Sequence, residues 1–129
     1  MAEEQANHEY DNYIISVANR LADELEEQIL LPVNSGVYFS KFDLMALSKE
    51  FGAAVNMTDW KKMFAQLFKH VDNEADLKRL LGLMEQFIEQ KRAVYRGYAE
   101  NYKHGEEAVK PLLEKTEAAL ERLKKAARV

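Results

Sequence analysis

The amino-acid sequence predicts an all-α fold: an antiparallel helical bundle of four to five helices, combining long amphipathic, coiled-coil-like helices with a short helical hairpin. Three observations predict it. Apolar residues recur at steps of three and four over most of the chain, which places them along one side of a helix. The two-residue alternation of a strand is nearly absent. Apolar residues make up 47% of the 129 positions, enough for one domain with a buried core.

The first helix is expected over residues 7–30, preceded by a disordered segment, residues 1–6. Pro32 and Gly36 follow the helix and predict its end. Apolar residues at steps of three and four define its buried side: Tyr10, Tyr13, Ile14, Val17, Ala18, Leu21, Leu25 and Ile29.

Acidic residues dominate this first helix. Residues 1–30 contain eight carboxylates and one arginine, a sum of −7, whereas the whole chain sums to −4. The later parts of the chain are neutral or slightly basic. This asymmetry is typical of a solvated acidic face, of pairing within the chain, or of a partner with a basic groove.

Two shorter helices are expected over residues 41–51 and 59–71, as a hairpin. Ser40, with an acid three residues later, predicts a capping box at the start of the first. Gly52 predicts its left-handed end. Asp59 stands where the second helix opens, and an apolar stripe follows it.

The last third of the chain carries a long heptad-like pattern that allows two interpretations. Either one helix runs through both segments, kinked at Pro111, or helices 74–104 and 108–127 are separated by a break near Gly105. The break is favoured because the apolar pattern shifts by one residue at the proline, which improves the match over the last segment.

A tyrosine stripe flanked by basic residues is the most unusual local feature. Tyrosines beside arginines are typical of protein–protein interfaces, because they bury a large area and keep a polar tip. The same rings could instead pack on the first helix, or stack on bases or a small ligand. The candidate interface residues are Arg92, Tyr95, Arg96, Tyr98, Tyr102 and His104.

The sequence lacks the residues that several classes of function require. The chain contains no cysteine, so disulfides and thiolate chemistry are excluded. The spacing of its three histidines from nearby acids does not match a helical metal site, and we expect neither a metal nor a cofactor. No apolar run approaches the roughly 18 residues of a membrane span, and no signal peptide is recognisable, so a cytoplasmic location and no membrane partner are expected.

The expected function follows from the long apolar stripes of the helices and from the lack of a catalytic group of residues in the sequence. We expect a non-catalytic helical protein–protein interaction module, such as an adaptor, regulator or assembly chaperone, with an unidentified protein partner. We also expect a homodimer, formed through residues 84–127. The alternative is a bundle that binds nucleic acid or a small ligand through the Arg/Tyr/His face of residues 92–104. Nucleic acid is the weaker candidate because its phosphates require clustered Lys and Arg.

Overall fold

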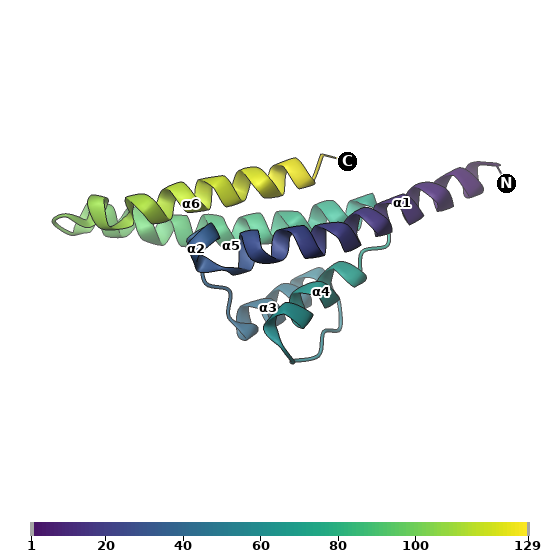
Figure 1. Cartoon of the computed structure of the whole chain (residues 1–129), viewed down its shortest axis with the longest axis horizontal. Coiled ribbons are helices and arrows are strands. Elements are labelled where there is room, and N and C mark those ends of the chain that lie inside the picture. Colours follow the sequence, from purple (N-terminus) through teal and green to yellow (C-terminus); the bar gives the residue numbers. More distant parts are fainter. Residues whose placement is uncertain (1, 129) are drawn as a thin grey trace.

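The computed structural model describes the backbone of residues 2–128 and the side chains of residues 8–128, and it is all-helical there. Its order is α1 (Ala2–Leu25), a short π-helix η1 (Glu26–Leu30), α2 (Pro32–Ser35), α3 (Lys41–Phe51), α4 (Trp60–Lys69), α5 (Glu74–Asn101) and α6 (Gly105–Ala126) (Figure 1). The described residues form no strand. The predicted all-α bundle is therefore confirmed.

The start of α1 differs from the expected one. We expected disorder over residues 1–6 and a helix from residue 7, but α1 begins at Ala2. Met1 and the side chains of residues 1–7 lie outside the described part of the chain. At its other end α1 widens into η1, and the short helix α2, which we did not expect, follows Leu31.

The long helices do not all alternate in direction. α1 and α5 run side by side in the same direction, and α6 folds back along α5 (Figure 1). Two contacts fix the shared direction: Tyr10, early in α1, bonds to Glu74 at the start of α5, and Gly36, after α2, bonds to Tyr95 near the end of α5. α6 is therefore antiparallel to α1 and α5, which are parallel to each other.

The short hairpin of α3 and α4 packs along the sides of α1 and α5 (Figure 1). Its starting signal is the predicted capping box: Ser40 Oγ accepts from Asp43 N at 3.0 Å, and Ser40 N donates to Asp43 Oδ2 at 2.9 Å. Gly52 ends α3 with φ +86°. Asp59 caps α4, which spans Trp60–Lys69 where residues 59–71 were expected.

The core lies where α1, α4 and α5 meet, and α6 covers one side of it. Phe39, in the segment between α2 and α3, is buried there and stacks on Phe87 of α5 with ring centroids 4.3 Å apart. Trp60 Nε1 donates to the Phe39 carbonyl at 2.6 Å, which ties α4 to the same point. These contacts hold the α3–α4 hairpin against the middle of α5.

The chain breaks between α5 and α6, as the phase shift predicts. α5 ends at Asn101 and α6 begins at Gly105, so the expected bounds at 104 and 108 are each displaced by three residues. Pro111 lies inside α6, where its side chain is exposed. The two helices form a hairpin instead of one long arm.

Candidate protein-interaction surface

The turn of the α5–α6 hairpin stands clear of the rest of the bundle. In Figure 1 this end projects past α2 and past the α3–α4 hairpin. Three large side chains near the end of α5 are exposed there: Val94 by 66%, Tyr98 by 45% and Tyr102 by 62%. We call Val94, Tyr98 and Tyr102 the aromatic tip.

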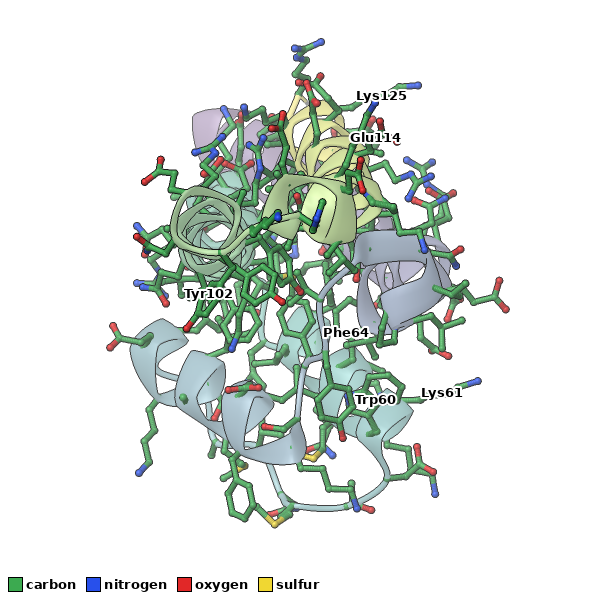
Figure 2. All side chains as sticks on the ribbon, turned by 90° about the vertical axis from the view of Figure 1, so that its left-hand side faces the viewer. Trp60, Lys61, Phe64, Tyr102, Glu114 and Lys125 are labelled. Carbon is green, nitrogen blue, oxygen red and sulfur yellow. The ribbon has the colours of Figure 1, made fainter. Side chains whose placement is uncertain are left out.

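The two tyrosines of the aromatic tip form a preformed pair. Their ring centroids lie 4.7 Å apart and the rings are inclined by 27°, a stacked arrangement. Val94 precedes Tyr98 by four residues and therefore lies one turn away on the same side of α5. In Figure 2 this end of the molecule faces the viewer, and Tyr102 points toward the side where α3 lies.

The turn itself depends on one close approach between backbones. A Cβ atom on Gly105 would overlap the carbonyl oxygen of Tyr98, so the first residue of α6 can lie against the last turn of α5 only as glycine. His104 precedes it in the left-handed region, at φ +64°. This compact turn brings α6 back along α5 and leaves Tyr102 at the outer edge.

Tyr95 belongs to the bundle and not to the exposed surface. Its hydroxyl donates to the carbonyl of Gly36 at 2.5 Å. Burial raises the pKa of Tyr95. A Cβ on Gly36 would lie 2.7 Å from the carbonyl oxygen of Leu112, so the turn after α2 fits closely between α5 and α6. Tyr95 therefore anchors the hairpin, and the tip beyond it is free.

The basic residues predicted to flank the tyrosines are spread around the hairpin. Arg92 is only 16% exposed and turns toward Glu89, 3.5 Å away. Arg96 precedes Tyr98 by two residues, and positions two apart on a helix point to different sides. His104 lies in the turn, beyond the last residue of α5. The six candidate residues therefore do not share one face of the hairpin, and the interface expected over residues 92–104 stays a prediction.

Sequence reasoning missed two residues on the tyrosine side of α5. Neither Val94 nor Lys91 is among the candidate interface residues that the sequence predicts. Lys91 Nζ lies 5.4 Å from the ring centroid of Phe87, a cation–π contact. The series Phe87, Lys91, Val94 and Tyr98 advances in steps of four, three and four, a second stripe that the sequence displays beside the heptad seam.

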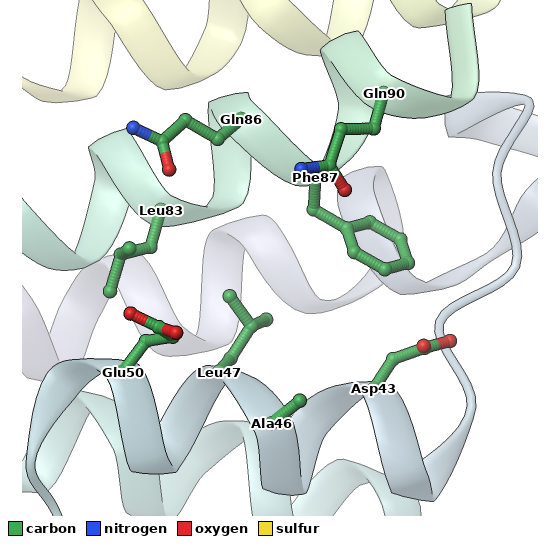
Figure 3. Close-up of a pocket in the computed structure, with 8 residues that line it drawn as sticks. All are labelled: Asp43, Ala46, Leu47, Glu50, Leu83, Gln86, Phe87 and Gln90. Atoms are coloured by element: carbon green, nitrogen blue, oxygen red, sulfur yellow. The ribbon is translucent and has the colours of Figure 1, made fainter.

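An open hollow of about 300 Å³ lies between α3 and α5 (Figure 3). Leu47, Leu83 and Phe87 supply its apolar residues. Asp43 and Glu50 line it from α3, but Asp43 already accepts the capping bond from Ser40 N. One free carboxylate beside apolar side chains is not a catalytic arrangement, since acid–base chemistry needs a second group poised near the first.

The described residues offer neither a metal site nor a membrane helix. No group of three or more His, Asp or Glu side chains among them is arranged to hold a metal ion. None of their helices is both long and apolar enough to cross a bilayer. Comparison with protein-family models, with curated proteins and with solved structures finds no match to this chain, so its function has to be argued from its own surfaces.

Proposed function

We propose that this chain is a non-catalytic helical protein–protein interaction module, an adaptor, regulator or assembly chaperone, that binds its partner through the aromatic tip. One observation carries the proposal. Tyr98 and Tyr102 are stacked on each other and yet stay largely exposed, on a part of the hairpin that projects past the bundle. Exposed aromatic clusters of this kind are typical of binding surfaces.

The stacked pair suits binding because its geometry is already set. A tyrosine buries a large area while it fixes few rotatable bonds, and its hydroxyl can still find a hydrogen-bond partner. Because the rings already rest on each other, less side-chain freedom is lost when a partner covers them. The Gly105 turn and the Tyr95–Gly36 bond hold the backbone beneath the pair.

The surroundings of the tip favour a helical partner. Phe87 packs on Phe39 and lines the hollow beside α3. Val94 and Tyr98 extend the same side of α5 beyond the N-terminus of α3 at Lys41. A partner helix that lies in line with α3 would cover this bare continuation, with its apolar side on the tyrosines.

We also propose that the module is a homodimer and acts in the cytoplasm. The surface first expected for the dimer, residues 84–127, is largely used within the chain. Met84 and Ile88 of α5 and Leu120 and Leu123 of α6 are buried in the described monomer. A dimer therefore needs another surface.

The tip can be tested by placing a photo-crosslinking amino acid at position 94 of the full chain in its own cells. The double variant Tyr98→Ala with Tyr102→Ala serves as the loss-of-function arm. Loss of hot-spot residues typically costs about 2 kcal/mol or more each, so the crosslinked protein should fall to background. Phe42→Ala on α3, where Phe42 is 76% exposed, is the matched control and should leave the crosslink unchanged.

Two results would contradict this function. A crosslinked protein that persists in the double variant would show that the tyrosines do not bind it. Recovery of nucleic acid instead of protein, lost at raised salt, would favour the alternative class, because phosphate contacts weaken steeply with salt. Circular dichroism of the double variant should match the unsubstituted chain, since both rings are largely exposed.

A further inference from the structure

A second surface lies at the other end of the molecule, between α1 and α6. Both helices rest against α5, and a groove of about 580 Å³ separates them. Lys125 lines the groove from α6, on the face of the molecule that is turned away from α3 and α4 (Figure 2). Val17, Leu21 and Leu25 of α1 form the apolar floor of the groove, although they are themselves buried, and Tyr13 lines the groove with 55% of its surface exposed.

The charge of this groove is strongly positive. Arg122 and Lys125 line it from α6, Arg128 lines it just after α6, and Arg20 lines it from α1, against the single carboxylate of Glu24. That carboxylate lies 3.6 Å from Arg20 and so offsets one of the four cations. Among the described residues Arg122 Nη1 is buried and has no hydrogen-bond partner, and a buried guanidinium donor without an acceptor is costly. The groove therefore favours an acidic occupant.

The same chain carries an acidic helical segment at the start of α1. Residues 2–13 hold the carboxylates of Glu3, Glu4, Glu9 and Asp11 and no lysine or arginine. This part of α1 extends past the end of α6 (Figure 1). Helical periodicity places on one side of it a stripe of small and aromatic residues: Ala2, Ala6, Tyr10 and Tyr13. Tyr10 remains 41% exposed although it bonds to Glu74.

We propose that two copies of this chain form a closed dimer in which residues 2–13 of each copy lie in the α1–α6 groove of the other. The inference rests on the proposed dimer and is independent of the aromatic tip. The acidic segment meets the four cations of the groove, and the stripe of Tyr10 and Tyr13 covers its apolar surface.

Both contacts can form in one symmetric dimer because the acidic segment and the α1 wall of the groove are neighbouring stretches of the same helix. Residues 2–13 span about 18 Å, and the groove continues along the same helix from Tyr13 to Gln28 over about 24 Å, long enough to hold the segment. A two-fold axis across α1 near Tyr13 sets the two α1 helices antiparallel and places each segment beside the other groove at once. An acidic helix of another protein would fill the groove alone, whereas a second copy both fills it and covers the exposed rings of Tyr10 and Tyr13.

A charge exchange tests the pairing. An acidic-groove variant carries Arg122→Glu with Lys125→Glu, and a basic-segment variant carries Glu3→Lys with Glu9→Lys. Each alone places like charges opposite each other, so its dimer dissociation constant should rise by at least about a hundredfold and its mass should approach 14.9 kDa. An equimolar mixture should recover a dimer that contains one copy of each, measured by sedimentation and native mass spectrometry.

Control variants distinguish pairing at the groove from a general effect of charge and from binding at the aromatic tip. Lys41→Glu with Lys49→Glu, on exposed positions of α3, makes the same change of charge away from the groove and should keep the dimer. The Tyr98→Ala/Tyr102→Ala variant should also keep it, which separates the groove from the tip. Circular dichroism of each variant checks that the helices persist.

Three results would overturn the inference. A monomeric unsubstituted chain at high micromolar concentration would remove the dimer and the groove pairing together. A dimer that survives in both charge variants would keep the proposed dimer but place it on another surface. Two monomeric variants that fail to combine when mixed would show that segment and groove do not meet.

Discussion

The hydroxyl of Tyr95 donates a hydrogen bond of 2.5 Å to the carbonyl of Gly36, fifty-nine residues earlier in the chain. This bond joins the last third of α5 to the turn that follows α2. Gly36 is itself buried, and its left-handed φ of +73° turns the chain toward Val37. The contact marks the point where the bundle ends and the free part of the α5–α6 hairpin begins.

Removing that hydroxyl with Tyr95→Phe should destabilise the protein by about 1–2 kcal/mol, because a buried carbonyl loses its donor. Urea unfolding followed by the fluorescence of the single tryptophan, Trp60, measures it. Tyr98→Phe is the matched control on an exposed ring and should change little. Equal effects of the two substitutions would mean that the Gly36 bond contributes nothing.

The same bond should depend on pH in the alkaline range. Burial raises the pKa of Tyr95 above its ordinary value of 10.0. The contribution is therefore fully present below pH 10.0 and is lost as the pH rises through the folded-state pKa. The stability difference between the unsubstituted chain and Tyr95→Phe should shrink over that range. A difference that stays constant with pH would show that the pKa of Tyr95 is the same in the folded and the unfolded chain.

Two glycines of the α5–α6 hairpin should respond to alanine in opposite directions. Gly105→Ala places a methyl group against the Tyr98 carbonyl and should cost about 1–3 kcal/mol as the turn shifts. Gly97→Ala, within α5 and with open space around it, should stabilise by about 0.5–1 kcal/mol, since glycine is the poorer helix residue. Thermal unfolding compares them. Stabilisation by both would contradict the close approach at the turn.

The capping box of α3 should be worth a measurable part of the stability. Ser40→Ala removes the acceptor for Asp43 N and should cost about 0.5–2 kcal/mol. Ser16→Ala, at an exposed position inside α1, is the control and should be neutral or slightly stabilising. Chemical denaturation resolves this difference. If the two serines behave alike, the box does not stabilise the start of α3.

The contact between α1 and α5 can be followed through one carboxyl group. A hydrogen bond from Lys78 and a second from Tyr10 lower the pKa of Glu74 below its ordinary 4.5. Tyr10→Phe removes the second donor, so the pKa of Glu74 should move back up, measured by an NMR titration of its side-chain carboxyl carbon. Tyr13→Phe, on the neighbouring ring, leaves that donor in place and should not move it.

The lowered pKa of Glu74 also makes the stability of the protein depend on pH. Its contribution to stability is present above pH 4.5 and is lost as the pH falls through the folded-state pKa. In Tyr10→Phe the loss should be smaller than in the unsubstituted chain and complete at a higher pH, because the folded-state pKa then lies closer to 4.5. An unchanged acid profile would show that the Tyr10 bond does not persist in solution.

Most of the helical elements could be predicted because their signals are local. Ser40 and Gly52 define α3, whose predicted bounds 41–51 match the structure, since a cap and a left-handed glycine act over single turns. The break before α6 followed from the phase shift near Pro111. The short helix α2 was missed although its signals are local, because Pro32 at its first position and the left-handed Gly36 at its end were taken to mark the end of the first helix. The π-helical end of α1 was not predicted either.

The candidate surface was predicted less well. The sequence brought Tyr98 and Tyr102 to attention, but it grouped them with Tyr95, which is held by Gly36, and with Arg96, which points elsewhere. Spacing along a helix shows which residues share a side. It cannot show which side the neighbouring helices cover, and that alone separates a buried anchor from an exposed ring.

By itself the sequence determined the secondary structure and the charge distribution, because helix periodicity, caps and counted charges are properties of residues close in the chain. Tertiary structure alone decided that α1 and α5 run in the same direction, that Tyr95 is anchored while Tyr98 is free, and that a cationic groove opens between α1 and α6. Those outcomes depend on contacts between residues tens of positions apart. Such contacts are selected by the packing of whole helix faces, which no local pattern specifies.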